Sequence, residues 1–196
     1  MPEAPRKKGG PRKRRAPKKV TQSHLANAAL HYLSRFATTA ENLRRVLMRR
    51  VEKSARHHGT DPAEGAEWIE DLIQRYQRTG LLNDAAYAEV RAGDMLRRGT
   101  PVKGVRFKLM QKGVGPDDID QALAAATEDM PQPDLAAAAA LARRRRLGPY
   151  ASPDKRQDRR DKDLATLARA GFDYDTARRV IEAETVDDLE HMLDDG

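Results

Sequence analysis

The stretch KLMQKGVGPDDIDQAL, residues 108–123, returns in outline 58 residues later as TLARAGFDYDTARRVI, residues 166–181. Few residues are identical, but Leu109 aligns with Leu167, Gly113 with Gly171 and Leu123 with Ile181. In both stretches an apolar helical pattern ends at a glycine, and a second helical pattern begins after it. The chain therefore contains a repeated helical unit, which is typical of an elongated array whose units pack on their neighbours.

Helical spacing of apolar residues extends from His24 to the end of this repeat, so we expect an all-α chain. The stretch GLLNDAAYAEV, residues 80–90, predicts a helix that ends at Gly80 and another that is capped by Asn83. Leu82 and Tyr87 then form the hydrophobic pair that fixes how the chain enters the second helix. This corner lies between the first and second units of the predicted array.

Cap residues and prolines mark the other helix starts. The expected starts are a capping box formed by Thr38 and Glu41, and the dipeptides Asp61-Pro62, Thr100-Pro101 and Ser152-Pro153. The predicted organisation is an elongated array of three tandem three-helix repeats over residues 23–80, 81–130 and 131–184. A disordered basic arm, residues 1–22, precedes them, and an acidic tail, residues 185–196, follows them.

The composition suits thin helical layers better than one thick core. The chain has 196 residues, of which 34% are charged and only 5% are aromatic, and it has no cysteine. Disulfides and thiolate sites are therefore excluded. No stretch of 18 apolar residues and no secretory signal is present, so we expect a cytoplasmic protein.

The net charge of +7 is unevenly distributed along the chain. Residues 1–19 contain nine Lys and Arg against one Glu, and residues 182–196 contain seven acidic residues with no Lys or Arg. The remaining body is mildly basic. A basic arm on a basic body indicates a polyanionic partner, most simply nucleic acid, although a charge run can also serve solubility alone.

No enzyme motif is present: the sequence lacks a phosphate-binding loop, a nucleophile elbow and a zinc-protease motif. The adjacent histidines His57 and His58 have no third ligand at a recognisable spacing, and we expect no metal, no cofactor and no catalytic residue. Five aromatic residues fall on or near apolar stripes and are expected in the core. They are Tyr32, Phe36, Trp68, Tyr76 and Phe107, which leaves Tyr150 as the aromatic expected to be exposed.

Four segments together resemble the RecX family of bacterial regulators of the RecA recombinase. They are AALHYLSRFATTAENLRRVLMRR, IEDLIQRYQRTGLLNDAAYAE, RRGTPVKGVRFKLMQKGVGPDDIDQAL and LARAGFDYDTARRVIE, and the similarity covers residues 25–184 in order. The resemblance implies three tandem three-helix repeats and a non-enzymatic modulator, usually an inhibitor, in DNA repair and the SOS response. Such proteins lie in the groove of the RecA–DNA filament and limit its growth, ATPase and strand exchange. The arm and the tail lie outside the resemblance.

A groove-binding regulator needs a long positive surface, and the candidates are cations outside the apolar stripes. They are Arg97, Arg98, Lys103, Arg106, Lys108, Lys112, Arg143, Arg144, Arg145, Arg146, Lys155, Arg156, Arg159, Arg160 and Lys162. The last five alternate with aspartates, which favours internal ion pairs on an exposed helix over direct phosphate binding there. The expected partners are the RecA filament and, weakly, single- and double-stranded DNA, with the protein a monomer. A general DNA-binding protein that acts through the arm and a protein scaffold remain alternatives.

Overall fold

The computed structural model describes residues 18–194, and within that range it contains ten α-helices, one short 3-10 helix and no β-strand. The prediction of an all-α chain is thus confirmed. The helices are α1 (Gln22–Leu33), α2 (Ala40–His58), α3 (Pro62–Arg78), α4 (Asp84–Arg97), α5 (Val102–Gln111), α6 (Pro116–Thr127), α7 (Pro133–Arg145), the 3-10 helix η1 (Gly148–Tyr150), α8 (Pro153–Ala170), α9 (Tyr174–Glu182) and α10 (Val186–Asp194).

The first unit consists of α1, α2 and α3 around its own core, from Val20 to Leu82. Asp61 caps α3 with its side chain and Pro62 follows as the first helical residue, as predicted. Thr21, which is not among the predicted caps, caps α1 in the same way. The capping box is wrong by one position: Thr39, not Thr38, caps α2. Glu41 pairs instead with Arg44 and Arg45 one turn along the helix.

The second unit consists of α4, α5 and α6, and a second core runs from Ala88 to Leu123. Asn83 caps α4 by accepting a hydrogen bond from the Ala86 N–H at 2.9 Å, and Leu82 is buried, so the predicted corner is confirmed. α5 differs from the prediction, because its cap is Pro101 and no side chain of its own segment caps it.

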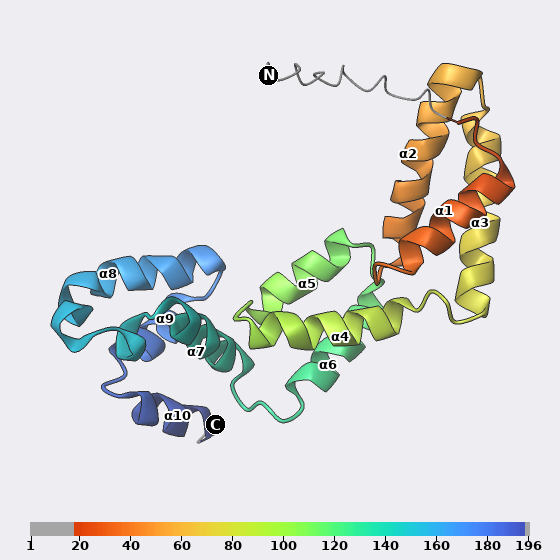
Figure 1. Cartoon of the computed structure of the whole chain (residues 1–196). Helices are drawn as coiled ribbons and strands as arrows, with labels where there is room; N and C mark the ends of the chain where they lie inside the picture. Colours follow the sequence, from red (N-terminus) through yellow and green to blue (C-terminus); the bar gives the residue numbers. More distant parts are fainter. Residues whose placement is uncertain (1–17, 195–196) are drawn as a thin grey trace, which may run out of the picture.

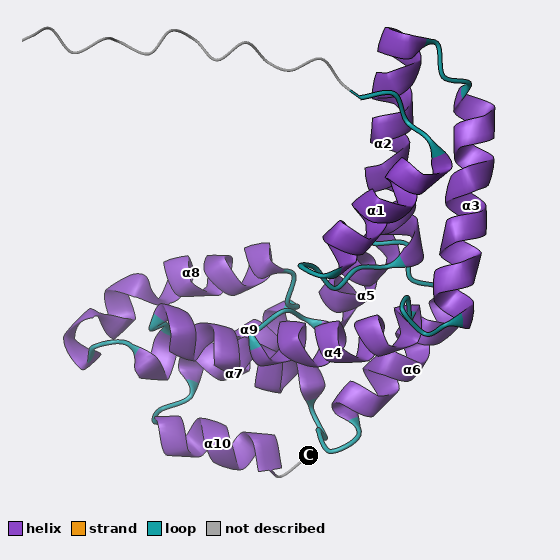
Figure 2. Ribbon diagram, turned by 45° about the vertical axis from the view of Figure 1, so that its right-hand side comes forward, coloured by secondary structure: helices purple, strands orange, loops and turns teal. Residues whose placement is uncertain are grey.

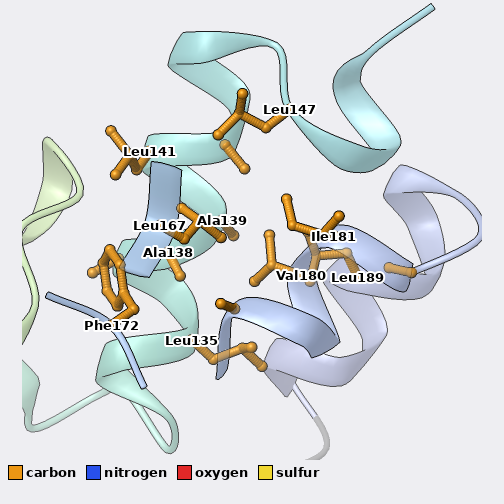
Figure 3. Packing of buried hydrophobic residues seen from close by; sticks show 14 of the residues in the cluster. Leu135, Ala138, Ala139, Leu141, Leu147, Leu167, Phe172, Val180, Ile181 and Leu189 are labelled. Atoms are coloured by element: carbon orange, nitrogen blue, oxygen red, sulfur yellow. The ribbon is translucent and has the colours of Figure 1, made fainter. Parts of the chain in front are cut away.

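The third unit consists of α7, η1, α8 and α9, and it also includes α10 from the predicted acidic tail. Figure 3 shows Leu189 of α10 among the buried side chains of this core, next to Val180 and Ile181, and Leu189 is fully buried. The tail segment therefore contributes Leu189 to the third core, with Met192 and Leu193 packed against it, while its acidic residues stay exposed.

The N-terminal arm is described only from Lys18. Val20 is 2% exposed and donates its N–H to Ser54 Oγ at 2.9 Å, so the last residues of the predicted arm belong to the first unit. The prediction of a disordered basic arm otherwise concerns residues 1–17, which lie outside the described residues.

Two aspartates join neighbouring units by the same device. Asp84, the first residue of α4, accepts a hydrogen bond from the Ala40 N–H at the start of α2 at 2.9 Å. Asp134, in the first turn of α7, accepts one from the Val102 N–H at the start of α5 at 2.7 Å. Burial raises the pKa of Asp84, and its bond to Ala40 opposes that rise. Each unit thus caps the second helix of the unit before it.

Replacing Asp134 by alanine is expected to lower the free energy of unfolding by about 1 kcal/mol, because α5 would lose its only side-chain cap. Asp134→Asn keeps an oxygen that accepts the hydrogen bond, so its free energy of unfolding should fall much less. Urea denaturation followed by circular dichroism measures both. An equal loss in the two variants would show that the charge of Asp134, rather than its hydrogen bond, supports the junction.

The three units form a bent, elongated body (Figures 1 and 2). In Figure 1 the second helices of the units, α2, α5 and α8, follow the inner side of the bend, whereas α3 and α6 lie on the outer side. The three separate cores explain this shape, because each unit buries its own apolar residues and contacts its neighbours mainly through helix ends.

Two of the five aromatic residues predicted in the core are exposed instead. Phe36 and Phe107 are 54% and 53% exposed, whereas Tyr76 is buried and Tyr32 and Trp68 pack against the first core. Tyr150 is half-buried against the third core rather than exposed. Phe107 is exposed because Val105 and Leu109 already fill the contact of α5 with its unit, and nothing from another unit covers the opposite face.

Candidate nucleic-acid interface

The second helices of the three units lie end to end. At the junction of α5 and α2, the Thr39 hydroxyl donates to the Lys112 carbonyl and Arg45 donates to the Gln111 carbonyl at 3.1 Å. Gly113 adopts a φ of +80° there, and a Cβ on it would lie 2.3 Å from the Cβ of Glu41. The C-terminus of α5 is therefore held directly against the N-terminus of α2.

The junction of α8 and α5 follows the same plan. Gly171 ends α8 with a φ of +103°, and a Cβ on it would lie 3.5 Å from Pro101 Cγ and 3.8 Å from Lys103 Cε. Gly113 and Gly171, the glycines aligned in the sequence repeat, thus occupy equivalent positions at the two junctions. We call the resulting line of helices, α8–α5–α2, the second-helix row.

Charge differs with helix position in the first two units, whereas α9 of the third unit contains two Arg against two acidic residues. α2 contains six Lys and Arg against two Glu, α5 contains three against none, and α8 contains six against four Asp. The outer helices have the opposite balance. α3 contains two Arg against four acidic residues, and α6 contains three Asp and no Lys or Arg. The positive surface therefore follows the second-helix row on the inner side of the bend.

Internal contacts engage five of the predicted site residues. Arg97 pairs with Asp94 at 2.6 Å, Arg106 pairs with Asp120, and Arg159 lies 3.7 Å from Asp163. Arg160 pairs with Asp161 and Glu182, and Arg156 donates to the carbonyl oxygens of Ala183 and Glu184. In α8, internal ion pairs thus involve Arg159 and Arg160, while backbone carbonyl oxygens hold Arg156. These three side chains would have to exchange partners to bind phosphate.

The other predicted site residues are exposed and form no ion pair within residues 18–194. They are Arg98, Lys103, Lys108, Lys112, Arg143, Arg144, Arg145, Arg146, Lys155 and Lys162. The lysines on α5 and α8 lie along the second-helix row, and the arginines lie at the end of α7, where the chain turns through η1 into α8. These ten cations can bind an external anion without breaking an internal contact.

Four further cations, which were not among the predicted site residues, lie on α2 in this row. Arg49, Arg50, Lys53 and Arg56 are exposed and form no ion pair among the described residues. The run RRVEKSAR, residues 49–56, was a visible signal, but only the structure places α2 in line with α5 and α8. Arg44 differs from these four, because it forms a bidentate hydrogen bond with Glu70 of α3, in which Nη2 lies 2.9 Å from Oε2. This bond holds the pKa of the Glu70 carboxyl below its usual range.

Arg146 has an unusual backbone conformation. Its φ of 55° makes it the only non-glycine residue with a positive φ in the described part of the chain, and it caps α7 in the left-handed conformation. A side chain costs about 1 kcal/mol in this conformation, and glycine would avoid that cost.

Residues 18–194 contain neither a metal-binding cluster nor a membrane-spanning helix. No group of three or more His, Cys, Asp or Glu side chains there could hold a metal ion. None of the helices there combines the length and the apolar character needed to cross a bilayer. The basic surface is therefore the strongest candidate site that the described residues offer.

Known regulatory proteins have sequences similar to this chain. The family model described as the second three-helix domain of RecX matches residues 83–123. The chain is 41% identical over 182 residues to the regulatory protein RecX of Myxococcus xanthus. This alignment covers 90% of this chain and 96% of that protein. The chain is also 30% identical over 174 residues to the regulatory protein RecX of Agrobacterium fabrum. That alignment covers 89% of this chain and 90% of the relative.

A solved structure agrees with these sequence relatives. The crystal structure of a regulatory protein RecX matches 81% of this chain and 70% of its own, with a TM-score of 0.50 and 25% sequence identity. The repeated helical unit, the tandem architecture and near full-length similarity to named relatives thus lead to one conclusion: the chain is a member of the RecX family of regulatory proteins.

Proposed function

We propose that this protein regulates the RecA recombinase by lying along the groove of the RecA–DNA filament. The second-helix row is the observation that carries the proposal: three helices placed end to end on the inner side of a bent body, each with an excess of cations. A filament presents phosphates and protein along a spiral, and a curved rod with a positive inner side is complementary to it. The expected effect is inhibition of filament growth, ATPase and strand exchange.

The mechanism is occupancy by a preformed surface. The hydrogen bonds from Thr39, Arg45 and the capping aspartates fix the junctions before binding, so little ordering entropy is lost when the filament is engaged. Unpaired lysines and arginines release counterions as they approach phosphate. RecA subunits or a second DNA strand cannot then enter the same groove.

General DNA binding through the arm is a second candidate function, and the sequence favours it independently of the fold. Residues 1–17 contain seven Lys and Arg against one Glu. A short basic segment of this kind binds duplex DNA of any sequence, with an affinity that falls steeply as salt rises. The two functions differ in whether the arm or the folded body contains the activity.

Removal of residues 1–17 distinguishes regulation through the filament groove from DNA binding through the arm. A chain that begins at Lys18 keeps Val20 and its bond to Ser54, so the first unit stays intact. We expect it to retain most of the inhibition of the DNA-dependent ATPase of RecA, while its binding to bare duplex DNA weakens and becomes less dependent on salt. Parallel loss of inhibition and DNA binding would assign the activity to the arm and contradict the groove proposal.

A further inference from the structure

An apolar pocket of about 320 Å³ lies where the first unit meets the second, and we call it the junction pocket. Leu33 and Phe36, at the end of α1 and just after it, line one side. The corner after α3 and the first half of α4 line the other side with Leu81, Tyr87 and Val90. Phe36, Leu81 and Val90 are three of the seven large apolar side chains exposed in the described chain, so exposed apolar surface is concentrated here. Such a pocket, at the boundary of two units, is typical of a binding site.

The charge beside the junction pocket is positive. Arg91 lines the pocket, and no acidic side chain does. Arg98, at the C-cap of α4, follows Arg91 by two turns on the same side of the helix. Both arginines are exposed and form no ion pair within residues 18–194. Asp94 lies between them in the sequence, but it already pairs with Arg97 at 2.6 Å. The two arginines therefore remain available to carboxylates of another molecule.

These features fit an acidic amphipathic helix of another protein. In helix-in-groove recognition, one helix places the large apolar side chains of a single face into an apolar groove. An anchor of this kind contributes most when it fills a pocket, and the charged pairs lie around it. Nucleic acid fits less well, because phosphate binding needs several cations and the lining of this pocket contains one.

This chain does not offer a complementary occupant of its own. Residues 1–17 contain seven Lys and Arg against one Glu, so they would meet Arg91 with like charge. The exposed apolar pair of α5, Phe107 and Met110, shares its face with Lys103, so a second copy would also bring a cation to Arg91. The apolar residues of the acidic helix α10 already pack in the third core. The occupant is therefore a different protein.

We propose that the junction pocket binds an amphipathic helix of a partner protein, with a large apolar side chain in the pocket and carboxylates on Arg91 and Arg98. The proposal goes beyond regulation through the filament groove, because it uses neither DNA nor the second-helix row. Its test contains no RecA and no DNA, so its failure would leave the groove proposal standing.

The experiment measures the binding of three fluorescein-labelled synthetic peptides of equal length to the full chain by anisotropy. The acidic peptide is a helix with leucine and phenylalanine on one face and glutamates beside them. A second peptide has alanine in place of the apolar anchors, and a third has lysine in place of glutamate. The acidic peptide should bind at least about tenfold more tightly than the other two at about 0.15 M salt. The peptide without anchors controls for acidic peptides that bind the second-helix row by charge alone.

Three variants locate the binding site. Val90→Asp places a carboxylate in the pocket and should weaken binding of the acidic peptide at least about tenfold. Met110→Asp is the matched control, since it makes the same change in charge at a similarly exposed apolar residue of α5, and it should change binding little. Arg91→Glu should weaken the acidic peptide and strengthen the lysine peptide, because it reverses the charge beside the anchor. A merely structural defect would not produce that reversal.

Four results would overturn the proposal. They are absence of binding of the acidic peptide, equal binding of the three peptides, equal losses in Val90→Asp and Met110→Asp, and no reversal in Arg91→Glu. A chain that dimerises in sedimentation equilibrium, and becomes monomeric in Val90→Asp, would also contradict it by identifying a second copy as the occupant. Circular dichroism of each variant excludes unfolding as the cause, since all three residues are exposed.

Discussion

Replacing Gly99 by alanine is expected to lower the free energy of unfolding by about 3 kcal/mol or more, the largest stability effect of any single methyl group we predict. Gly99 has a φ of +80°, where a Cβ costs about 1–2 kcal/mol. The added Cβ would also lie 2.7 Å from the Leu141 nitrogen and 2.8 Å from the Ala137 oxygen of α7. These atoms belong to the helix backbone, so they can yield only if the third unit shifts.

Gly80→Ala is the matched control for this prediction. Gly80 has a nearly equal φ of +73°, but a Cβ there would meet no atom within 4 Å. It should therefore cost only the backbone term, about 1–2 kcal/mol. Guanidinium denaturation of both variants gives the comparison. Similar losses in the two would mean that the close approach of α4 and α7 does not stabilise the array.

Much of the fold was readable from the sequence because its determinants are local. Asn83 and Asp61 cap helices within their own segments, and the aligned Gly113 and Gly171 end equivalent helices. The caps from Asp84 and Asp134 were not readable, since they act across 44 and 32 residues. The position of a cap depends on which of two adjacent threonines starts the helix, and local spacing does not decide between Thr38 and Thr39.

The candidate site was less predictable for the same physical reason. Whether an arginine is available depends on its partner, and Arg106–Asp120 and Arg160–Glu182 join residues that are distant in the sequence. The spacing of apolar residues also could not show that α5 is covered on one face alone, so Phe107 was assigned to the core. Burial in a thin array depends on how its units bend, which no single helix reveals.

The basic residues of α2 show a related limit. Arg49, Arg50 and Lys53 are ordinary surface cations when α2 is considered alone. They become part of a long positive surface only because α5 ends against the start of α2, through Thr39 and Lys112. The length of this surface is a property of the junctions, and the glycines at the junctions allow the helix ends to approach closely.

Reversing charge at the centre of the second-helix row is expected to abolish most of the proposed regulation. Lys108→Glu combined with Lys112→Glu changes two exposed, unpaired cations one turn apart, in the last turn of α5 and at its C-cap. Each lost phosphate contact lowers the salt slope of binding by about one, and the new carboxylates add repulsion. We expect the concentration for half-inhibition of the RecA ATPase to rise more than about tenfold at low salt, and the difference to shrink as salt rises.

Arg75→Glu combined with Arg78→Glu supplies the control, because it makes the same change in net charge on α3, at the outer side of the bend. Both arginines are exposed and form no ion pair within residues 18–194. If inhibition depends on where the charge lies, this variant should inhibit almost as well as the unchanged protein. Equal losses in the two double variants would show that only net charge matters, and no loss in either would contradict the groove proposal. Loss confined to the α5 variant, with helicity intact, is the result that the second-helix row requires.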